Sequence, residues 1–115
     1  PLPHLPEGAP RLRTAVNDRQ RRGILIPSGE LADTDLSVGD RFTLKKGQRG
    51  LFMITLVKDP AGDVFFDRSG IFVERTRRVD LLLGGIFDTY GVEVVDAEPP
   101  LLKIRAVDPG LEAIR

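Results

Sequence analysis

The stretch Gly23–Phe42, "GILIPSGELADTDLSVGDRF", joins two apolar segments through a short polar one. Its β-branched start predicts a strand that ends at Pro27, because proline cannot donate to the hydrogen-bond ladder of a sheet. The polar middle is too short for a stable independent helix, so we expect only a turn or two of helix there. Gly39 and Asp40 predict a turn from which the next strand begins. The stretch therefore predicts two strands separated by a helical turn.

The segment before this stretch alternates in the manner of a strand. Leu12, Thr14 and Val16 alternate with Arg11, Arg13 and Ala15. A period of two is typical of a pleated strand that turns one face to the core. Asn17-Asp18 is typical of a turn. Residues 11–26 are therefore predicted to form a hairpin that carries arginines on its strand and on its turn.

Apolar and β-branched runs predict further strands downstream. They fall within 38–47, 49–59, 63–68, 70–75, 92–96 and 101–107. Turn residues separate 63–68 from 70–75, and 92–96 from 101–107, so each of these pairs is predicted to form a hairpin. Asp18-Arg19 precedes "GILIP" and Asp67-Arg68 precedes "GIFVE", but with different spacing. We interpret this likeness as a coincidence between two hairpins.

One helix is predicted over Thr76–Tyr90. Its apolar residues recur at the spacing of one helical face, at Val79, Leu82, Leu83, Ile86, Phe87 and Tyr90. We expect this helix to bury Leu82, Ile86 and Phe87, and to end at Gly91, where a C-terminal glycine is common. Gly84 and Gly85 would each weaken the helix interior by about 1 kcal/mol relative to alanine.

Composition excludes several classes of protein. The chain has 115 residues and no cysteine, which excludes disulfides and cysteine-ligated metals. No apolar run approaches the ~20 residues that a membrane-spanning helix needs, so we expect a soluble cytoplasmic protein without a membrane partner. The one histidine, His4, lies in a proline-rich tail, residues 1–10, that we expect to be flexible.

The acidic residues do not predict a catalytic or metal site. Asp63, Asp67, Glu74 and Asp80 are the candidate carboxylate cluster for a hard metal ion, but their positions on turns and at a helix start are typical of solvated side chains. We therefore expect no enzymatic activity, no catalytic residue, no bound metal and no cofactor.

The zero net charge hides an asymmetry along the chain. Residues 1–58 hold 10 Lys and Arg against 6 Asp and Glu, whereas residues 59–115 hold 7 against 11. Five arginines, at positions 11, 13, 19, 21 and 22, lie close together with Asp18 as the only acidic residue among them. A basic segment of this kind predicts a polyanionic partner.

The segments "GILIP" at 23–27 and "LSVGDRFTL" at 36–44 resemble the N-terminal DNA-binding domain of the AbrB/MazE/SpoVT family. The resemblance covers about residues 12–58. It implies a swapped-hairpin β-barrel made by an intertwined homodimer. It also implies that basic residues of the first hairpin bind DNA. By position these are Arg11, Arg13, Arg19, Arg21 and Arg22. A second copy would also bury the apolar strands of the first half, which we do not expect to close a barrel alone.

The sequence therefore predicts a mainly β fold (α+β) with one or two helices. We expect a tail at 1–10, a DNA-binding and dimerisation domain at 11–58, and a region at 59–115 with a helix and hairpins. The alternatives for this last region are packing, oligomerisation, sensing of a ligand or binding of a protein partner. The predicted function is AbrB-like transcriptional regulation by a homodimer, or a higher homo-oligomer, that binds duplex DNA. The alternative is a protein-interaction or assembly module, or an antitoxin-like subunit.

Overall fold

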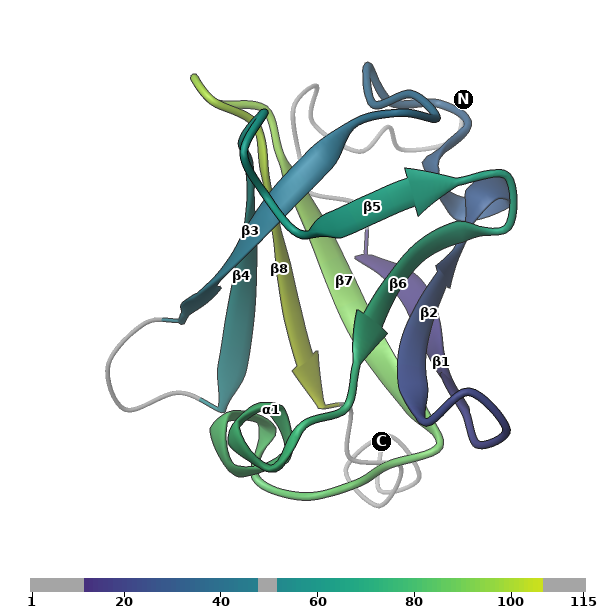
Figure 1. Cartoon of the computed structure of the whole chain (residues 1–115), viewed down its shortest axis with the longest axis vertical. Helices are drawn as coiled ribbons and strands as arrows, with labels where there is room; N and C mark the ends of the chain where they lie inside the picture. Colours follow the sequence, from purple (N-terminus) through teal and green to yellow (C-terminus); the bar gives the residue numbers. More distant parts are fainter. Residues whose placement is uncertain (1–11, 48–51, 107–115) are drawn as a thin grey trace, which may run out of the picture.

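The computed structural model describes residues 12–47 and 52–106, and its strands form one sheet (Figure 1). The elements are β1 (Leu12–Asp18), β2 (Gly23–Pro27), the 3-10 helix η1 (Ser28–Leu31), β3 (Arg41–Lys46), β4 (Met53–Lys58), β5 (Val64–Asp67), β6 (Gly70–Glu74), α1 (Arg77–Leu83), β7 (Thr89–Val95) and β8 (Leu101–Ala106). All the predicted hairpins are present in the described residues. The prediction of a mainly β fold is confirmed, with α1 as its one α-helix among those residues.

The sheet closes into an antiparallel barrel. Around the barrel the strands follow the order β1-β2-β6-β5-β3-β4-β8-β7, and β7 pairs back to β1. Alternate side chains of each strand point inward, as the pleat requires. Ile24, Ile26, Phe42 and Tyr90 are fully buried in this interior. The short helices close the ends of the barrel through Leu31 of η1 and Val79 and Leu83 of α1.

Pairs of strands from either side of residue 58 alternate around the barrel. β2 pairs with β6, β3 with β5, β4 with β8 and β1 with β7. The second half of the chain therefore buries Ile24, Ile26 and Phe42. The sequence-based expectation that a second copy is needed to bury them is not met. Leu44 is half-buried and packs against the same core. Burial no longer argues for a homodimer, which stays a prediction.

The faces of β1 are the reverse of what hydropathy indicates. Arg13 and Ala15 point into the barrel, whereas Leu12 and Val16 are 52% and 37% exposed. Ala15 lies opposite Tyr90 on β7. A small residue fits there because the fully buried Tyr90 ring occupies much of the interior beside it.

The predicted helix is half the expected length. α1 begins after Thr76, whose side chain accepts a hydrogen bond from the Val79 amide at 3.2 Å. It ends at Gly84, which is left-handed (φ 79°) and donates to the carbonyls of Asp80 and Leu81. Gly85 has φ 143°, so the chain leaves the helix through two glycines that adopt conformations costly for other residues.

The prediction that the helix continues from Gly84 to Tyr90 is therefore wrong. Tyr90 and Gly91 lie in β7, so Gly91 does not end the helix. Ile86 is 56% exposed, and the expectation that it is buried is also wrong. Leu82 and Phe87 are half-buried against the core. Tyr90 fits the helical spacing of apolar residues although it lies in β7. It is apolar because the interior of the barrel needs a buried aromatic side chain at that position.

The barrel is built from two halves with the same order of elements. β1, β2, η1, β3 and β4 correspond in order to β5, β6, α1, β7 and β8. Exchanging each strand for its counterpart leaves the strand order around the barrel unchanged. The pairs β2–β6 and β4–β8 each consist of two counterparts, so the exchange returns the same pair. The pair β1–β7 is converted into β5–β3, which is also present. The chain thus contains an internal pseudo-two-fold axis.

The strand registers obey the same symmetry. Each pairing that involves a strand of the first half has a counterpart with the same register. The pair Asn17–Ile24 corresponds to Phe66–Ile71. In the same way Ala15–Tyr90 corresponds to Val64–Phe42, and Leu44–Leu56 corresponds to Val92–Ile104. On β2 and β6, Gly23 faces Glu74 and Pro27 faces Gly70, so the axis passes through the central pair, Leu25 and Phe72. The likeness of "GILIP" to "GIFVE" therefore marks equivalent strands, and its interpretation as a coincidence is wrong.

We expect Gly70→Ala to lower the free energy of unfolding by at least about 2 kcal/mol. Gly70 has φ 134°, and a Cβ atom there would lie 1.9 Å from the Ile26 carbonyl oxygen. Gly29→Ala is the matched control, since a Cβ there meets no atom within 4 Å. Urea unfolding of both variants measures the difference. Equal stability of the two variants would contradict the close approach of β6 to β2.

Candidate nucleic-acid interface

The pseudo-symmetry gives the barrel two equivalent ends, which lie apart in Figure 1. At one end the β1–β2 turn contacts the start of α1, and the Arg75 amide donates to the Arg22 carbonyl at 2.9 Å. At the other end the β5–β6 turn contacts the start of η1, and the Ser28 amide donates to the Ser69 carbonyl at 3.0 Å. The same main-chain bond therefore holds the turn at each end.

The two ends carry opposite charge. The first, residues 17–22 and 75–88, holds six arginines and three aspartates, and we call it the basic end. The second, residues 28–40 and 66–69, holds five acidic residues and Arg68, and we call it the acidic end. Two of its carboxylates, Asp33 and Asp40, pair with Arg13 and Lys58 from neighbouring strands. Charge is thus divided unevenly between the two ends although the net charge of the chain is zero. A polyanion would be attracted more strongly to the basic end than to the acidic end.

Three of the predicted DNA-binding arginines lie on the turn of the basic end. Arg19 pairs with Asp88 at 2.9 Å, but both side chains are about four-fifths exposed, so this pair contributes little to stability. The guanidinium of Arg21 lies 4.0 Å from the centre of the Phe72 ring. Arg22 is exposed and left-handed, with φ 55°.

Three further arginines at this end were missed from the sequence. Arg75 is largely buried and bonds to Asn17 at 2.8 Å and Asp80 at 3.2 Å. Arg77 and Arg78 are exposed at the start of α1. Within the described residues, the side chains of Arg22, Arg77 and Arg78 make no hydrogen bond or ion pair. The run "RTRR" at 75–78 was the available signal, and the acidic charge of the second half concealed it.

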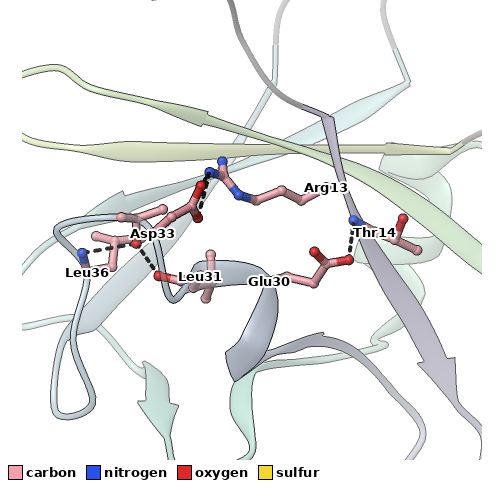
Figure 2. A network of polar contacts seen from close by, with 7 residues as sticks. Arg13, Thr14, Glu30, Leu31, Asp33 and Leu36 are labelled. Atoms are coloured by element: carbon pink, nitrogen blue, oxygen red, sulfur yellow. Dashed lines mark hydrogen bonds and ion pairs between the residues drawn. The ribbon is translucent and has the colours of Figure 1, made fainter.

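Arg13 is separate from this group. It projects into the barrel wall beside η1, only 9% exposed, and its Nη2 lies 3.0 Å from both carboxylate oxygens of Asp33 (Figure 2). Its Nε is buried without a partner among the described residues. Arg13 therefore belongs to the structural interior near the acidic end, and Arg11 lies outside the described residues.

The contacts around Arg13 hold the segment after β2 against β1. Glu30 of η1 accepts a hydrogen bond from the Thr14 amide at 3.3 Å (Figure 2). The Thr34 hydroxyl donates to the Leu31 carbonyl at 2.7 Å and accepts from the Leu36 amide at 3.2 Å. These bonds satisfy main-chain groups that a short 3-10 helix leaves free.

The carboxylates considered for a metal site do not gather. No group of three or more His, Cys, Asp or Glu side chains within residues 12–47 and 52–106 is placed to hold a metal ion. Asp67 is engaged locally instead. Hydrogen bonds from the Ser69 hydroxyl, at 2.6 Å, and from the Ser69 amide, at 2.8 Å, lower the pKa of Asp67 below its ordinary value of 3.8. This carboxylate stays charged and adds to the acidic end.

Neither helix in the described part of the chain has the length and apolarity that a membrane crossing requires. Comparisons with protein-family models, with curated proteins and with solved structures give no match for this chain. The geometry and charge of the two ends are therefore the basis for inferring a function.

We expect Arg13→Ala to lower the free energy of unfolding by about 1–3 kcal/mol, because it removes a buried side chain together with its hydrogen bonds to the half-exposed Asp33. DNA affinity of the folded variant should stay within about twofold of the wild type, since Arg13 lies outside the basic end. Thr14→Ala, on the outer face of the same strand, is the control, with an expected change of at most about 0.5 kcal/mol. Urea unfolding and fluorescence anisotropy measure the two quantities. A folded Arg13 variant that loses DNA binding would contradict this assignment.

Proposed function

We propose that this protein binds duplex DNA through its basic end, as a transcriptional regulator of the AbrB-like type, and that it has no enzymatic activity. The observation that carries the proposal is the contrast between the two ends. Both share one main-chain frame, yet six arginines lie at one and a cluster of carboxylates at the other. The fold does not demand this difference, so a binding function is its simplest physical reason.

The arginines of the basic end suit a phosphate backbone. Arg22, Arg77 and Arg78 have no partner in the described part of the chain, so binding a phosphate would break no existing bond. A guanidinium forms two parallel hydrogen bonds to a phosphate or to a guanine edge, which one ammonium cannot do. Arg21 is already oriented by the Phe72 ring, which lowers the entropy lost on binding.

The pseudo-symmetry also bears on the fold of the resembled family. We propose that the two halves of this chain are structurally equivalent to the two separate chains of a swapped-hairpin dimer. β1–β2 and β5–β6 would then be the two exchanged hairpins, and the first half would be complete only with the second. In the homodimer predicted from the sequence, whole barrels would associate and present two basic ends to DNA.

A second candidate function is protein binding, through the wall between β3 and β6. The β3–β4 ladder is flanked by the bonds Asp59 N to Arg41 O and Gly47 N to Met53 O. Because bonds alternate along an antiparallel ladder, the main-chain groups of Leu44 and Lys46 face away from β4.

Nothing in the described part of the chain pairs with those groups. β5 pairs with β3 only at Arg41 and Phe42, and a pocket of about 510 Å³ lies beside Leu44, between Phe65 and Phe72. An unpaired strand edge beside a pocket lined by both apolar and charged side chains favours an extended peptide that adds a strand. This would be the interaction module that the sequence leaves as the alternative.

We expect Arg21→Ala and Arg77→Ala each to weaken duplex binding by about three- to tenfold at low salt. The physical reason is the loss of one phosphate contact, which should also make the slope of log affinity against log salt less negative by about 0.9. Fluorescence-anisotropy titration of a labelled promoter duplex and a random duplex measures both quantities.

Arg68→Ala is the matched control for these variants, because Arg68 lies in the equivalent turn at the acidic end and is also exposed. Its affinity should equal that of the wild type. Absence of binding by the wild type, or equal loss in all three variants, would reject the basic end as a DNA site and leave the protein-binding candidate ahead.

Light scattering at micromolar concentration tests the homodimer. We expect a folded barrel at every concentration, since one chain buries its own core, and a mass of twice 12.7 kDa if whole barrels pair. A mass of 12.7 kDa at high concentration would contradict the homodimer and leave one barrel as the binding unit.

A further inference from the structure

The basic end contains a pocket of about 450 Å³ between the β1–β2 turn, the start of α1 and the chain that enters β7. Its lining consists of Asn17, Arg19, Arg22, Arg75, Ile86, Phe87 and Asp88. Three guanidinium groups thus meet one carboxylate around a hollow large enough for a phosphate and an attached group.

Arg75 forms the fixed part of this pocket. Its side chain is 16% exposed, with Nη1 bonded to Asn17 Oδ1 at 2.8 Å and Nε bonded to Asp80 Oδ1 at 3.2 Å. Its Nη2 has no hydrogen-bond partner in the described part of the chain. The guanidinium is therefore oriented before any ligand arrives, and it keeps free N–H groups to donate.

The other side chains complete an anion site. Arg22 has no partner of its own, and its carbonyl is tied to the Arg75 amide, so the two arginines are held side by side. Arg19 is paired only with the exposed Asp88, and an anion could replace that carboxylate at small cost. Ile86 and Phe87 supply an apolar wall, and Phe87 is held by a bond from its amide to the buried hydroxyl of Tyr90 at 3.0 Å.

The equivalent place at the acidic end shows that the arginines are not required by the fold. There the same main-chain bond joins Ser28 to Ser69, which correspond to Arg75 and Arg22. Two serines thus occupy the positions of two arginines on one backbone frame. The main-chain frame alone therefore does not require arginine at these positions, although at the basic end Arg75 also bonds to Asn17, whose counterpart is Phe66.

We propose that this pocket is a phosphate-binding site for a nucleotide, with Arg22 and Arg75 as the principal donors, Arg19 as a third, and the apolar wall against the attached sugar or base. The phosphate has two possible sources, the backbone of bound DNA or a free nucleotide. The first source rests on the proposed DNA-binding function, whereas the second is independent of it.

The test uses the symmetry of the molecule. The double variant Arg22→Ser, Arg75→Ser copies the acidic end, and Arg22→Gly removes one donor at a left-handed position that glycine adopts freely. Arg22→Gly should fold as the wild type does, because the Arg22 side chain makes no bond within the described residues. Arg68→Ser is the control at the opposite end.

In the first arm, amide NMR spectra of each protein are titrated with inorganic phosphate and with a deoxynucleoside monophosphate. We expect the wild type and Arg68→Ser to shift the amides of Asn17, Arg22 and Phe87, with the monophosphate binding several-fold more tightly than phosphate. Both pocket variants should lose this response. In the second arm, the pocket variants should bind duplex DNA about fivefold more weakly than the wild type, with a less negative salt slope.

The two arms separate the two proposals. A nucleotide response without DNA binding would support the pocket and reject the DNA-binding function. DNA binding that is equally tight in Arg22→Gly and in the wild type, together with unshifted amides in the first arm, would reject the pocket and leave the DNA-binding function standing. The pocket would also be rejected if Arg22→Gly kept the amide shifts with phosphate and the monophosphate, and only an unfolded double variant lost them.

Discussion

The pairing of β2 with β6 is the interaction on which the rest of the structure depends. These two strands cross the pseudo-two-fold axis at Leu25 and Phe72 and join the halves of the chain. Each is flanked by its own hairpin partner, so their pairing brings both hairpins into one sheet. Neither half has enough strands to enclose Phe42 or Tyr90, and a sheet left open would expose both its core and its edges. The chain therefore folds as one unit because each half supplies what the other lacks.

The same symmetry separates what the fold requires from what it tolerates. Positions that meet in the interior are apolar in both halves, as with Ile24 and Ile71 or Phe42 and Tyr90. Gly23 and Gly70 are retained because a Cβ atom at either would collide with the neighbouring strand. Positions on the turns and after the second strand differ freely, and there the charges have separated into a basic and an acidic end. A difference in charge on a shared frame is typical of binding surfaces, since packing does not produce it.

The two candidate functions use adjoining parts of the molecule, because Arg21 and Arg78 of the basic end also line the pocket beside Leu44. DNA would meet the basic end, whereas a peptide strand would enter the wall where β5 leaves β3. That opening arises because the β5–β6 hairpin is shorter than β1–β2, its counterpart. The equivalent place in the other half is closed by the full pairing of β1 with β7. The asymmetry between the halves thus creates both candidate sites, at positions that the symmetric part of the fold does not use.

The sequence by itself determined most of the strands. Alternating or apolar runs and their turn residues predicted the β1–β2, β5–β6 and β7–β8 hairpins, Pro27 ended β2 where it was expected to, and the turn at Gly39-Asp40 led into β3. These features depend on the conformations of neighbouring residues, which the sequence encodes directly. It also indicated Arg19, Arg21 and Arg22 as a basic turn. Tertiary structure decided which segments meet, because the partner of a strand is chosen by burial across the whole barrel. Only the fold turned Arg13 inward, ended α1 at Gly84 through a left-handed conformation, and placed Arg75, Arg77 and Arg78 beside a turn more than fifty residues earlier in the chain.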